Sequence, residues 1–228
     1  MTVRLHFADA GEAGDLAAFL ARLIHYDKAA AVRLQAAGET LAVFGRPPSF
    51  EVLAIRTARL AKPYEHGLDT SLDVTVSAGE LLESVGESAE VVETAGTVAV
   101  PGAVTGPPWA GVLPPRGGWR QVAGLPPVSA MRALVQGAVT EFRARVEELA
   151  PERRVRAELD RVGREIWSRT VAGTGMPVRA AHAAHSLGFL RGEDLTLLAA
   201  GVWLRLRTPY GSVALRQAGV GALSVTPT

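Results

Sequence analysis

The chain has 228 residues, a net charge of +1 and no cysteine, and 48% of its residues are apolar and 21% are charged. This length and composition are typical of a folded protein with a sizeable core, and they exclude an intrinsically disordered chain. The absence of cysteine excludes disulfides, thiolate zinc sites and cysteine nucleophiles.

The first residues of the sequence lack the pattern of an export signal. Residues 3–7 alternate apolar with charged or polar side chains, and Asp9, Glu12 and Asp15 follow them. A signal peptide would need a basic start and an unbroken apolar run. No window reaches the roughly 18 apolar residues of a membrane span. We therefore expect a cytoplasmic protein that has no membrane partner.

The first 95 residues predict an α+β domain, an antiparallel sheet with two helices. The first helix, at 11–25, can be opened by a capping box of Asp9 and Glu12, and the second by one of Ser77 and Glu80. Period-two alternation and turn residues predict the strands. These strands are 3–7, 31–35, 40–44, 50–56 and 72–76, with 89–93 and 97–100 as a closing hairpin.

Residues 96–127 predict a crossing segment between two halves of the chain. Its many prolines and glycines cannot sustain a helix or a central strand. Exposed indoles gain nothing in water, so we expect Trp109 and Trp119 to be mostly buried against the surface. The alternative is a proline-rich ligand for a partner domain.

Residues 128–228 predict a helical region that ends in a β-hairpin. Helices are expected at 129–149, from about 152 to 167, and at 177–187, with Gly188 as the C-terminal cap. The hairpin strands, 203–207 and 212–217, flank the turn Thr208-Pro209-Tyr210-Gly211. The predicted division is therefore 1–95, 96–127 and 128–228, with the two halves separate or packed as one body.

Three stretches of the N-terminal half resemble one module of the DNA sliding clamps in their order of strands and helices. They are the helix at 11–25, the hairpin at 33–43 and the run at 72–82. The resemblance covers residues 1–100 and implies a clamp-like topology.

Two features depart from a clamp that encircles DNA. Residues 128–228 do not repeat the pattern. The second predicted helix carries Glu80, Glu83 and Glu87, whereas a helix that faces DNA phosphates should be basic. The resemblance therefore concerns topology and implies no function.

The chain also resembles an uncharacterised protein family of high-GC bacteria. The residues that carry this resemblance are Pro-Trp-Ala-Gly-Val at 108–112, Pro114-Pro115-Arg116 with Trp119, and Leu187-Gly188-Phe189-Leu190. Asparagine is absent and only Lys28 and Lys62 are lysines, a bias that follows from GC-rich codons. This family brings no activity that could be transferred.

The sequence favours a non-catalytic interaction or assembly protein without a cofactor. It contains no P-loop, no dinucleotide fingerprint and no Gly-x-Ser-x-Gly elbow. Trp109, Arg116 and Trp119 form an aromatic-arginine cluster of the kind found at interface hot spots, and we predict that they bind the partner. The partner is another protein or a second copy of the chain.

One alternative is a nucleic-acid-binding protein with a winged helix-turn-helix at 152–217. Arg205, Arg207 and Arg216 would lie on the hairpin wing and Arg179 on the third helix, where guanidinium groups can contact phosphates. The predicted recognition helix is alanine-rich and lacks the Asn and Gln that read adenine.

The other alternative is an enzyme with a pocket between the two halves. His182 and His185 are three residues apart and fall on one helical face, where they could share a metal ion or work with Glu193. The pair lacks the HExxH spacing and a third ligand near it on the helix, so we predict no tightly held metal.

Charge is unevenly divided along the chain. Residues 1–95 carry a net charge of −6 and residues 151–228 one of +5. We expect an association, with a partner or between copies, that weakens as salt rises.

Overall fold

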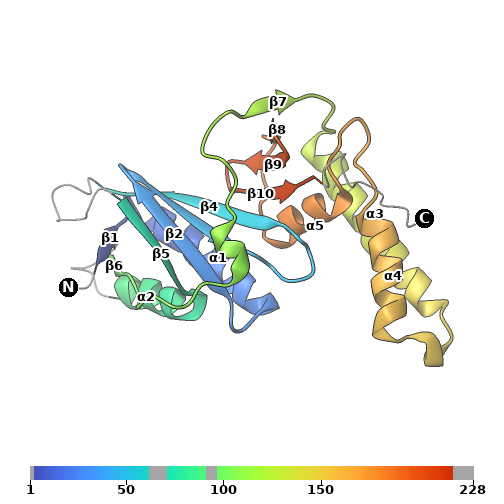
Figure 1. The fold of residues 1–228 in the computed structure, drawn as a ribbon, viewed down its shortest axis with the longest axis horizontal. Helices are drawn as coiled ribbons and strands as arrows, with labels where there is room; N and C mark the ends of the chain where they lie inside the picture. The colour runs from blue at the N-terminus through green and yellow to red at the C-terminus, as the bar shows by residue number, and fades with distance from the viewer. Residues whose placement is uncertain (1–2, 62–70, 91–96, 218–228) are drawn as a thin grey trace, which may run out of the picture.

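The computed structural model describes residues 3–61, 71–90 and 97–217. Its strands are β1 (Arg4–His6), β2 (Ala31–Ala37), β3 (Thr40–Gly45), β4 (Leu53–Arg59), β5 (Ser71–Ser77), β6 (Thr97–Ala99), β7 (Arg120–Val122), β8 (Thr196–Ala200), β9 (Trp203–Thr208) and β10 (Gly211–Arg216). Eight of them form one antiparallel sheet in the order β5-β2-β3-β4-β10-β9-β8-β7, and β1 pairs with β6 in a second, small sheet (Figure 1).

The helices connect these strands. They are α1 (Ala10–Tyr26), α2 (Ala78–Glu90), α3 (Val128–Glu147), α4 (Arg156–Trp167) and α5 (Val178–Ser186), with the short 3-10 helices η3 (Pro108–Gly111) and η4 (Pro151–Arg153). The predicted α+β class, an antiparallel sheet with two helices followed by a helical region and a hairpin, is confirmed. Among the described residues, no helix combines the length and apolar character needed to cross a bilayer.

The large sheet joins the N-terminal and C-terminal parts of the chain. Strand β4 pairs with β10, placing Ile55 opposite Ser212 and Leu53 opposite Ala214. Strands from the first 80 residues therefore continue into strands from the last 40 without a break in the sheet.

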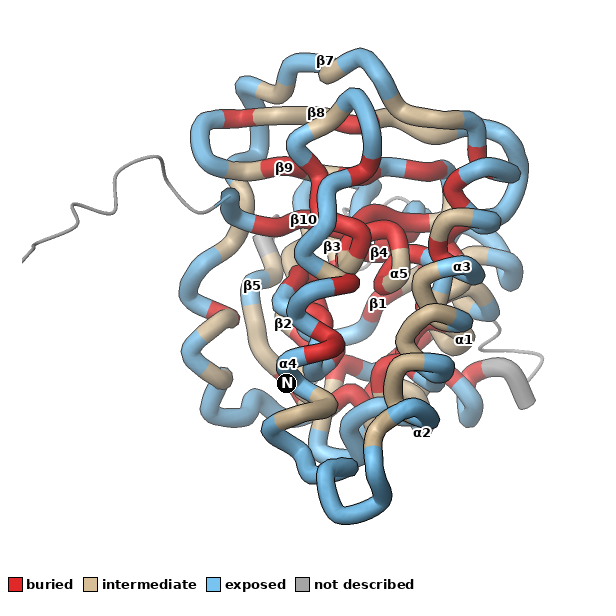
Figure 2. The backbone as a smooth tube through the Cα atoms, turned by 90° about the vertical axis from the view of Figure 1, so that its right-hand side faces the viewer, coloured by how far each residue is buried: buried red, intermediate tan, exposed pale blue. Residues whose placement is uncertain are grey.

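Helices cover one face of this sheet and form the main core with it. Helix α1 contacts β4, and α5 contacts β9 and β10. One cluster of buried side chains runs through both parts, and it includes Leu20 of α1, Leu34 of β2, Ala181 of α5 and Val213 of β10. Figure 2 shows buried segments of the helices and of the strands facing each other in the interior. A hairpin of α3 and α4 extends away from this body (Figure 1).

Local sequence signals account for the helix ends. The Asp9 carboxylate accepts a hydrogen bond from the Glu12 amide at 3.0 Å, and the Ser77 hydroxyl accepts one from the Glu80 amide at 3.4 Å. In both predicted capping boxes the hydrogen bond to the side chain of the first residue is therefore present. After α5, Gly188 adopts a φ of 73°, the left-handed conformation that ends many helices.

Two predicted strands are corrected by the structure. The strand expected at 50–56 is β4, which begins only at Leu53, because Ser49 and Glu51 have left-handed φ values of 71° and 53° that no strand permits.

The closing hairpin expected from 89–93 and 97–100 is the other correction. Residues 89 and 90 belong to α2, and 91–93 lie outside the described residues. Strand β6 pairs instead with β1, far away in sequence, where Leu5 and Val98 are opposed and both fully buried.

Candidate functional site

The strand register identifies the residues on the face of the large sheet opposite the helices, which we call the open face. Directly opposed residues of antiparallel strands place their side chains on the same face. One such row crosses five strands through Arg33, Phe44, Ile55, Ser212 and Arg207.

A second row on this face lies beside the first. It passes through Gln35, Ala42 and Thr57, which are opposed in turn across β2, β3 and β4. Arg205 lies on the same face because it is opposite Ala214, two residues along β10 from Ser212. The open face therefore combines apolar, amide, hydroxyl and guanidinium groups.

Residues 103–119, which we call the strap, cross this open face from one edge of the sheet to the other (Figure 1). At the start, Ala103 is bridged to Val76 of β5, and the Val104 amide donates to the Thr75 carbonyl at 2.9 Å. The strap ends directly before β7, which pairs with β8 at the other edge. A proline-rich segment that includes the short 3-10 helix η3 is thus laid across the strands.

The strap packs on the sheet through a small second core. Phe44, Ile55 and Ala214 form its buried centre, and Trp109, Leu113, Ala42 and Trp203 pack against them. Arg33 also donates a hydrogen bond to the carbonyl oxygen of Ala110. The strap is held both by apolar contact and by this guanidinium.

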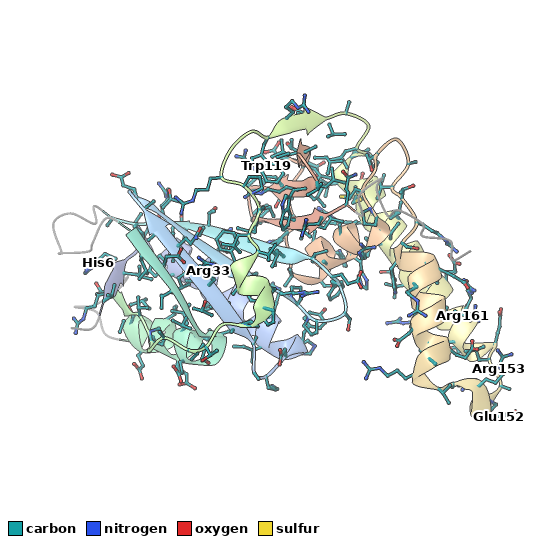
Figure 3. All side chains as sticks on the ribbon, viewed as in Figure 1. His6, Arg33, Trp119, Glu152, Arg153 and Arg161 are labelled. Atoms are coloured by element: carbon teal, nitrogen blue, oxygen red, sulfur yellow. The ribbon has the colours of Figure 1, made fainter. Side chains whose placement is uncertain are left out.

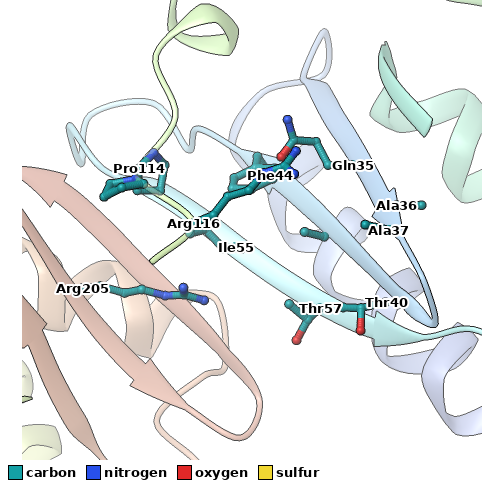
Figure 4. A pocket seen from close by; sticks show the side chains of 12 residues that line it. Gln35, Ala36, Ala37, Thr40, Phe44, Ile55, Thr57, Pro114, Arg116 and Arg205 are labelled. Carbon is teal, nitrogen blue, oxygen red and sulfur yellow. The ribbon is translucent and has the colours of Figure 1, made fainter. Parts of the chain in front are cut away.

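A pocket of about 230 Å³ lies between the strap and the open face (Figure 4). Ala42, Phe44 and Ile55 supply its apolar floor, and Pro114 and Pro115 of the strap form one wall. Its polar lining comes from Gln35, Thr40, Thr57, Arg116 and Arg205. The lining comes from β2, β3, β4, the strap and β9, so both halves of the chain contribute to it.

The Arg205 guanidinium is partly buried, and it faces no carboxylate among the described residues. Its Nε donates to the Ser212 hydroxyl at 2.8 Å, and its Cζ lies 5.9 Å from the centroid of the Trp119 ring. Burial lowers the pKa of Arg205, and the nearby charge of Arg207 lowers this pKa further. The positive charge at this wall of the pocket is therefore uncompensated.

The acid that interacts with Arg116 is already engaged. Asp73 binds Arg33 and accepts a further hydrogen bond from Gln35 at 3.0 Å. Its pKa lies below the usual value, mainly because of the hydrogen bond from Arg33, with smaller contributions from Gln35 and from the charges of Arg33 and Arg116. Asp73 thus balances Arg33 and leaves Arg116 without an ion pair in the described parts of the chain.

The structure brings the predicted partner-binding residues to this face. Trp109 and Trp119 are partly buried, and Arg116 is exposed. The Trp119 indole donates to the Pro115 carbonyl at 3.0 Å, which fixes the end of the strap (Figure 3). All three lie on the strap, and Arg116 lines the pocket.

The four arginines predicted to bind nucleic acid lie on two opposite faces of the sheet. Arg205, Arg207 and Arg216 share the open face, because their strand partners Ala214, Ser212 and Trp203 do. Arg179 lies on α5, on the helix-covered side, where its Nε is 3.6 Å from a carboxylate oxygen of Glu51.

The winged helix-turn-helix predicted for 152–217 is therefore wrong, although its hairpin exists. Strand β10 pairs with β4 as well as β9, and β9 pairs with β8 as well as β10. Both strands lie inside a large sheet, and neither can serve as a free wing.

His182, the first residue of the predicted histidine pair, is packed between aromatic rings. The ring of His182 stacks on Trp167 with centroids 4.5 Å apart and meets Phe50 edge-on at 5.1 Å. Burial lowers the pKa of His182 to about 4, and His185 lowers it as well. His185 and Glu193 are exposed. Within the described residues, no three His, Asp or Glu side chains gather as a metal site.

Sequence reasoning missed the floor of the pocket. Strand alternation does place Ala42 with Phe44, and Ile55 with Thr57, on common faces. That alternation does not identify the open face, which depends on where the helices pack and on the β4–β10 pairing.

Comparisons with known proteins add two family matches and one weak structural likeness. No curated relative matches the chain. A crystal structure of a DNA polymerase sliding clamp from Pseudomonas aeruginosa with ligand is similar at 13% identity and a TM-score of 0.47, over 100% of this chain and 68% of that one. Residues 1–111 match the family described as Domain of unknown function (DUF8010), and residues 114–220 match the one described as Domain of unknown function (DUF8185).

Proposed function

We propose that this chain is a non-catalytic interaction module that binds a segment of a partner protein, or of a second copy, in the pocket under the strap. The observation that carries the proposal is the pocket itself, with its apolar floor of Phe44 and Ile55. The guanidiniums of Arg116 and Arg205 also line it, and neither forms an ion pair within the described residues. Sites that recognise other molecules commonly combine an apolar cavity with a few polar groups that orient the ligand.

The side chains around the pocket are those that dominate interface energetics. Three of the four tryptophans lie on or over the open face, namely Trp109, Trp119 and Trp203. Tryptophan and arginine are enriched at hot spots, because they cover a large area and combine apolar contact with hydrogen bonding. This composition favours a binding surface.

The polar lining of the pocket suits recognition better than catalysis. It comprises Gln35, Thr40, Thr57 and the two arginines. These groups donate and accept hydrogen bonds, but none of them is a general base at neutral pH. The pocket can therefore bind and orient a ligand, and we assign it no reaction.

A library of random dodecapeptides displayed on phage tests the proposal. Thr57 is exposed on β4 and lines the pocket, so Thr57→Trp should fill the pocket without disturbing the core. Thr140→Trp, on an exposed position of α3, is the matched control. We expect peptides selected on the unmodified protein to bind the control and to lose binding to Thr57→Trp. Peptides that bind all three proteins alike would refute the proposal.

A nucleic-acid partner is the second candidate, and the shared face of Arg205, Arg207 and Arg216 favours it. Fluorescence anisotropy with a random DNA duplex, at low and at physiological salt, tests it. Several phosphate contacts should make the affinity fall steeply as salt rises. An absence of binding at low salt would eliminate this candidate.

A further inference from the structure

The chemistry of the ligand can be inferred from the charges in the pocket. A partly buried guanidinium normally has an anionic or carbonyl partner, because burial removes the water that stabilises its charge. Arg33 and Arg56 follow this rule, with Asp73 at 2.7 Å and Asp15 at 2.8 Å. Arg205 departs from it, since its one hydrogen bond goes to the neutral hydroxyl of Ser212.

Arg116 adds a second, exposed guanidinium to the same pocket. It is carried by the strap, whereas Arg205 is carried by β9, and both line the same cavity. No Asp or Glu is among the residues that line it. Two guanidiniums, one from the strap and one from β9, therefore face one cavity whose described lining includes no carboxylate.

The floor of the pocket sets a second requirement. Phe44 and Ile55 are buried and apolar, and the volume of about 230 Å³ suits side chains of a bound segment. A ligand that fills the pocket must therefore present an anionic group and an apolar group side by side.

We propose that the pocket binds an acidic peptide segment, in which an Asp or Glu carboxylate lies between Arg116 and Arg205 and a neighbouring apolar side chain rests on Phe44 and Ile55. This inference rests on the proposed function. Guanidinium and carboxylate form paired, charge-assisted hydrogen bonds, which gives the two arginines a direct role in choosing the ligand.

A peptide meets both requirements better than a nucleic acid does. Duplex DNA presents a dense row of phosphates and no aliphatic side chain for the apolar floor. Arg179, which was predicted to contact phosphates together with the three arginines of the hairpin, also lies on the other side of the sheet. The charges are thus concentrated at a small pocket with an apolar base.

Two matched peptide arrays test the inference. The first holds dodecapeptides with Asp or Glu beside Leu, Phe or Trp, and the second holds the same peptides with Asn for Asp and Gln for Glu. Binding is then measured by anisotropy for the full-length protein, for Arg116→Gln and Arg205→Gln, and for Arg156→Gln as the control. The Arg156 side chain is 94% exposed on α4, away from the pocket. Thermal unfolding of each variant checks that it is folded.

We expect the change from acid to amide to weaken binding roughly 10- to 100-fold for the unmodified protein and for Arg156→Gln, as for the loss of a charge-assisted hydrogen bond. For Arg116→Gln and for Arg205→Gln the same change should weaken binding several-fold less, because each variant removes one of the two guanidiniums that flank the carboxylate.

The remaining outcomes separate this inference from the proposed function. If both arrays bind equally and Thr57→Trp abolishes binding, the pocket binds peptides but does not select acids, and the inference fails alone. If neither array binds, or if every pocket variant binds the peptides with the affinity of the unmodified protein, both proposals fail. Binding of a random DNA duplex that requires Arg205, without any peptide binding, would overturn both in favour of a nucleic acid.

Discussion

Arg33 binds both carboxylate oxygens of Asp73, with Nε 2.7 Å from Oδ1 and Nη2 2.8 Å from Oδ2. The remaining arm of the same guanidinium donates to the Ala110 carbonyl. One side chain of β2 thus connects the edge strand β5 with the strap that crosses above it (Figure 3).

Replacing Arg33 should loosen the strap. In Arg33→Met we expect faster amide hydrogen exchange at 107–113 and stronger acrylamide quenching of Trp109, because the Ala110 carbonyl loses its donor. The cost in unfolding free energy should be only about 1 kcal/mol, since the Arg33–Asp73 pair is partly exposed. Arg156→Met is the control and should leave exchange in the strap unchanged. Unchanged exchange in Arg33→Met would show that apolar contacts alone hold the strap.

His182 should make stability depend on pH between about 4 and 6.5. Its folded pKa of about 4 lies below the ordinary value of 6.5, so the unfolded chain binds a proton first as the pH falls. The contribution of neutral His182 is complete above pH 6.5 and is lost as the pH falls toward 4. Urea unfolding at pH 7.5 and 4.5 should therefore show a smaller difference in His182→Phe than in the unmodified protein. His185→Phe, at an exposed position, should retain most of the difference, because burial is the larger cause of the low pKa of His182.

Gly211 cannot be replaced without loss of stability. A Cβ added there would lie 2.5 Å from Cε1 of Phe189, a ring that is itself buried, and the residue has a φ of 146°. We expect Gly211→Ala to cost on the order of 3 kcal/mol through overpacking and backbone strain. Gly201 has a φ of 54° and open space around its Cβ position, so Gly201→Ala isolates the strain and should cost about 1 kcal/mol. Equal losses measured by urea unfolding would contradict the role of Phe189.

We propose that the two halves of the chain unfold together. The β4–β10 pairing and the shared core give neither half a complete set of contacts without the other. Calorimetry, far-ultraviolet circular dichroism and tryptophan fluorescence should therefore report one coincident transition. Two separate transitions, one of them reproduced by residues 1–111 alone, would show that the halves are independent domains.

Local signals in the sequence predicted most elements of the fold. The β2–β3 hairpin follows from two apolar runs and from the turn at Gly38, whose φ is 57°. The β9–β10 hairpin follows from the Thr-Pro-Tyr-Gly turn, in which the Thr208 hydroxyl accepts a hydrogen bond from the Tyr210 amide at 3.1 Å. Such signals act within a few residues, where a single sequence is informative.

Pairing between distant strands was not predicted. The β1–β6 and β4–β10 pairs join residues about 90 and 160 positions apart, and they depend on side-chain packing that no local pattern records. Strand β8 was missed because Thr-Leu-Leu-Ala-Ala lacks the alternation of a half-buried strand. Because the β4–β10 pairing was not predicted, the candidate site was predicted as two separate parts. One was the cluster of Trp109, Arg116 and Trp119, and the other was the hairpin with Arg205, Arg207 and Arg216, and the sheet places both on one face.

The strap connects the two edge strands of the large sheet, and its length exceeds the distance that it spans. At about 4.8 Å per strand spacing, β5 and β7 lie at most about 34 Å apart. The chain from Ala103 to Arg120, roughly 17 residues, reaches about 56 Å when extended. This slack of about 20 Å allows the middle of the strap to rise from the sheet while both of its ends stay hydrogen-bonded. A bound segment can therefore enter beneath the strap from the side, without any strand of the sheet being broken.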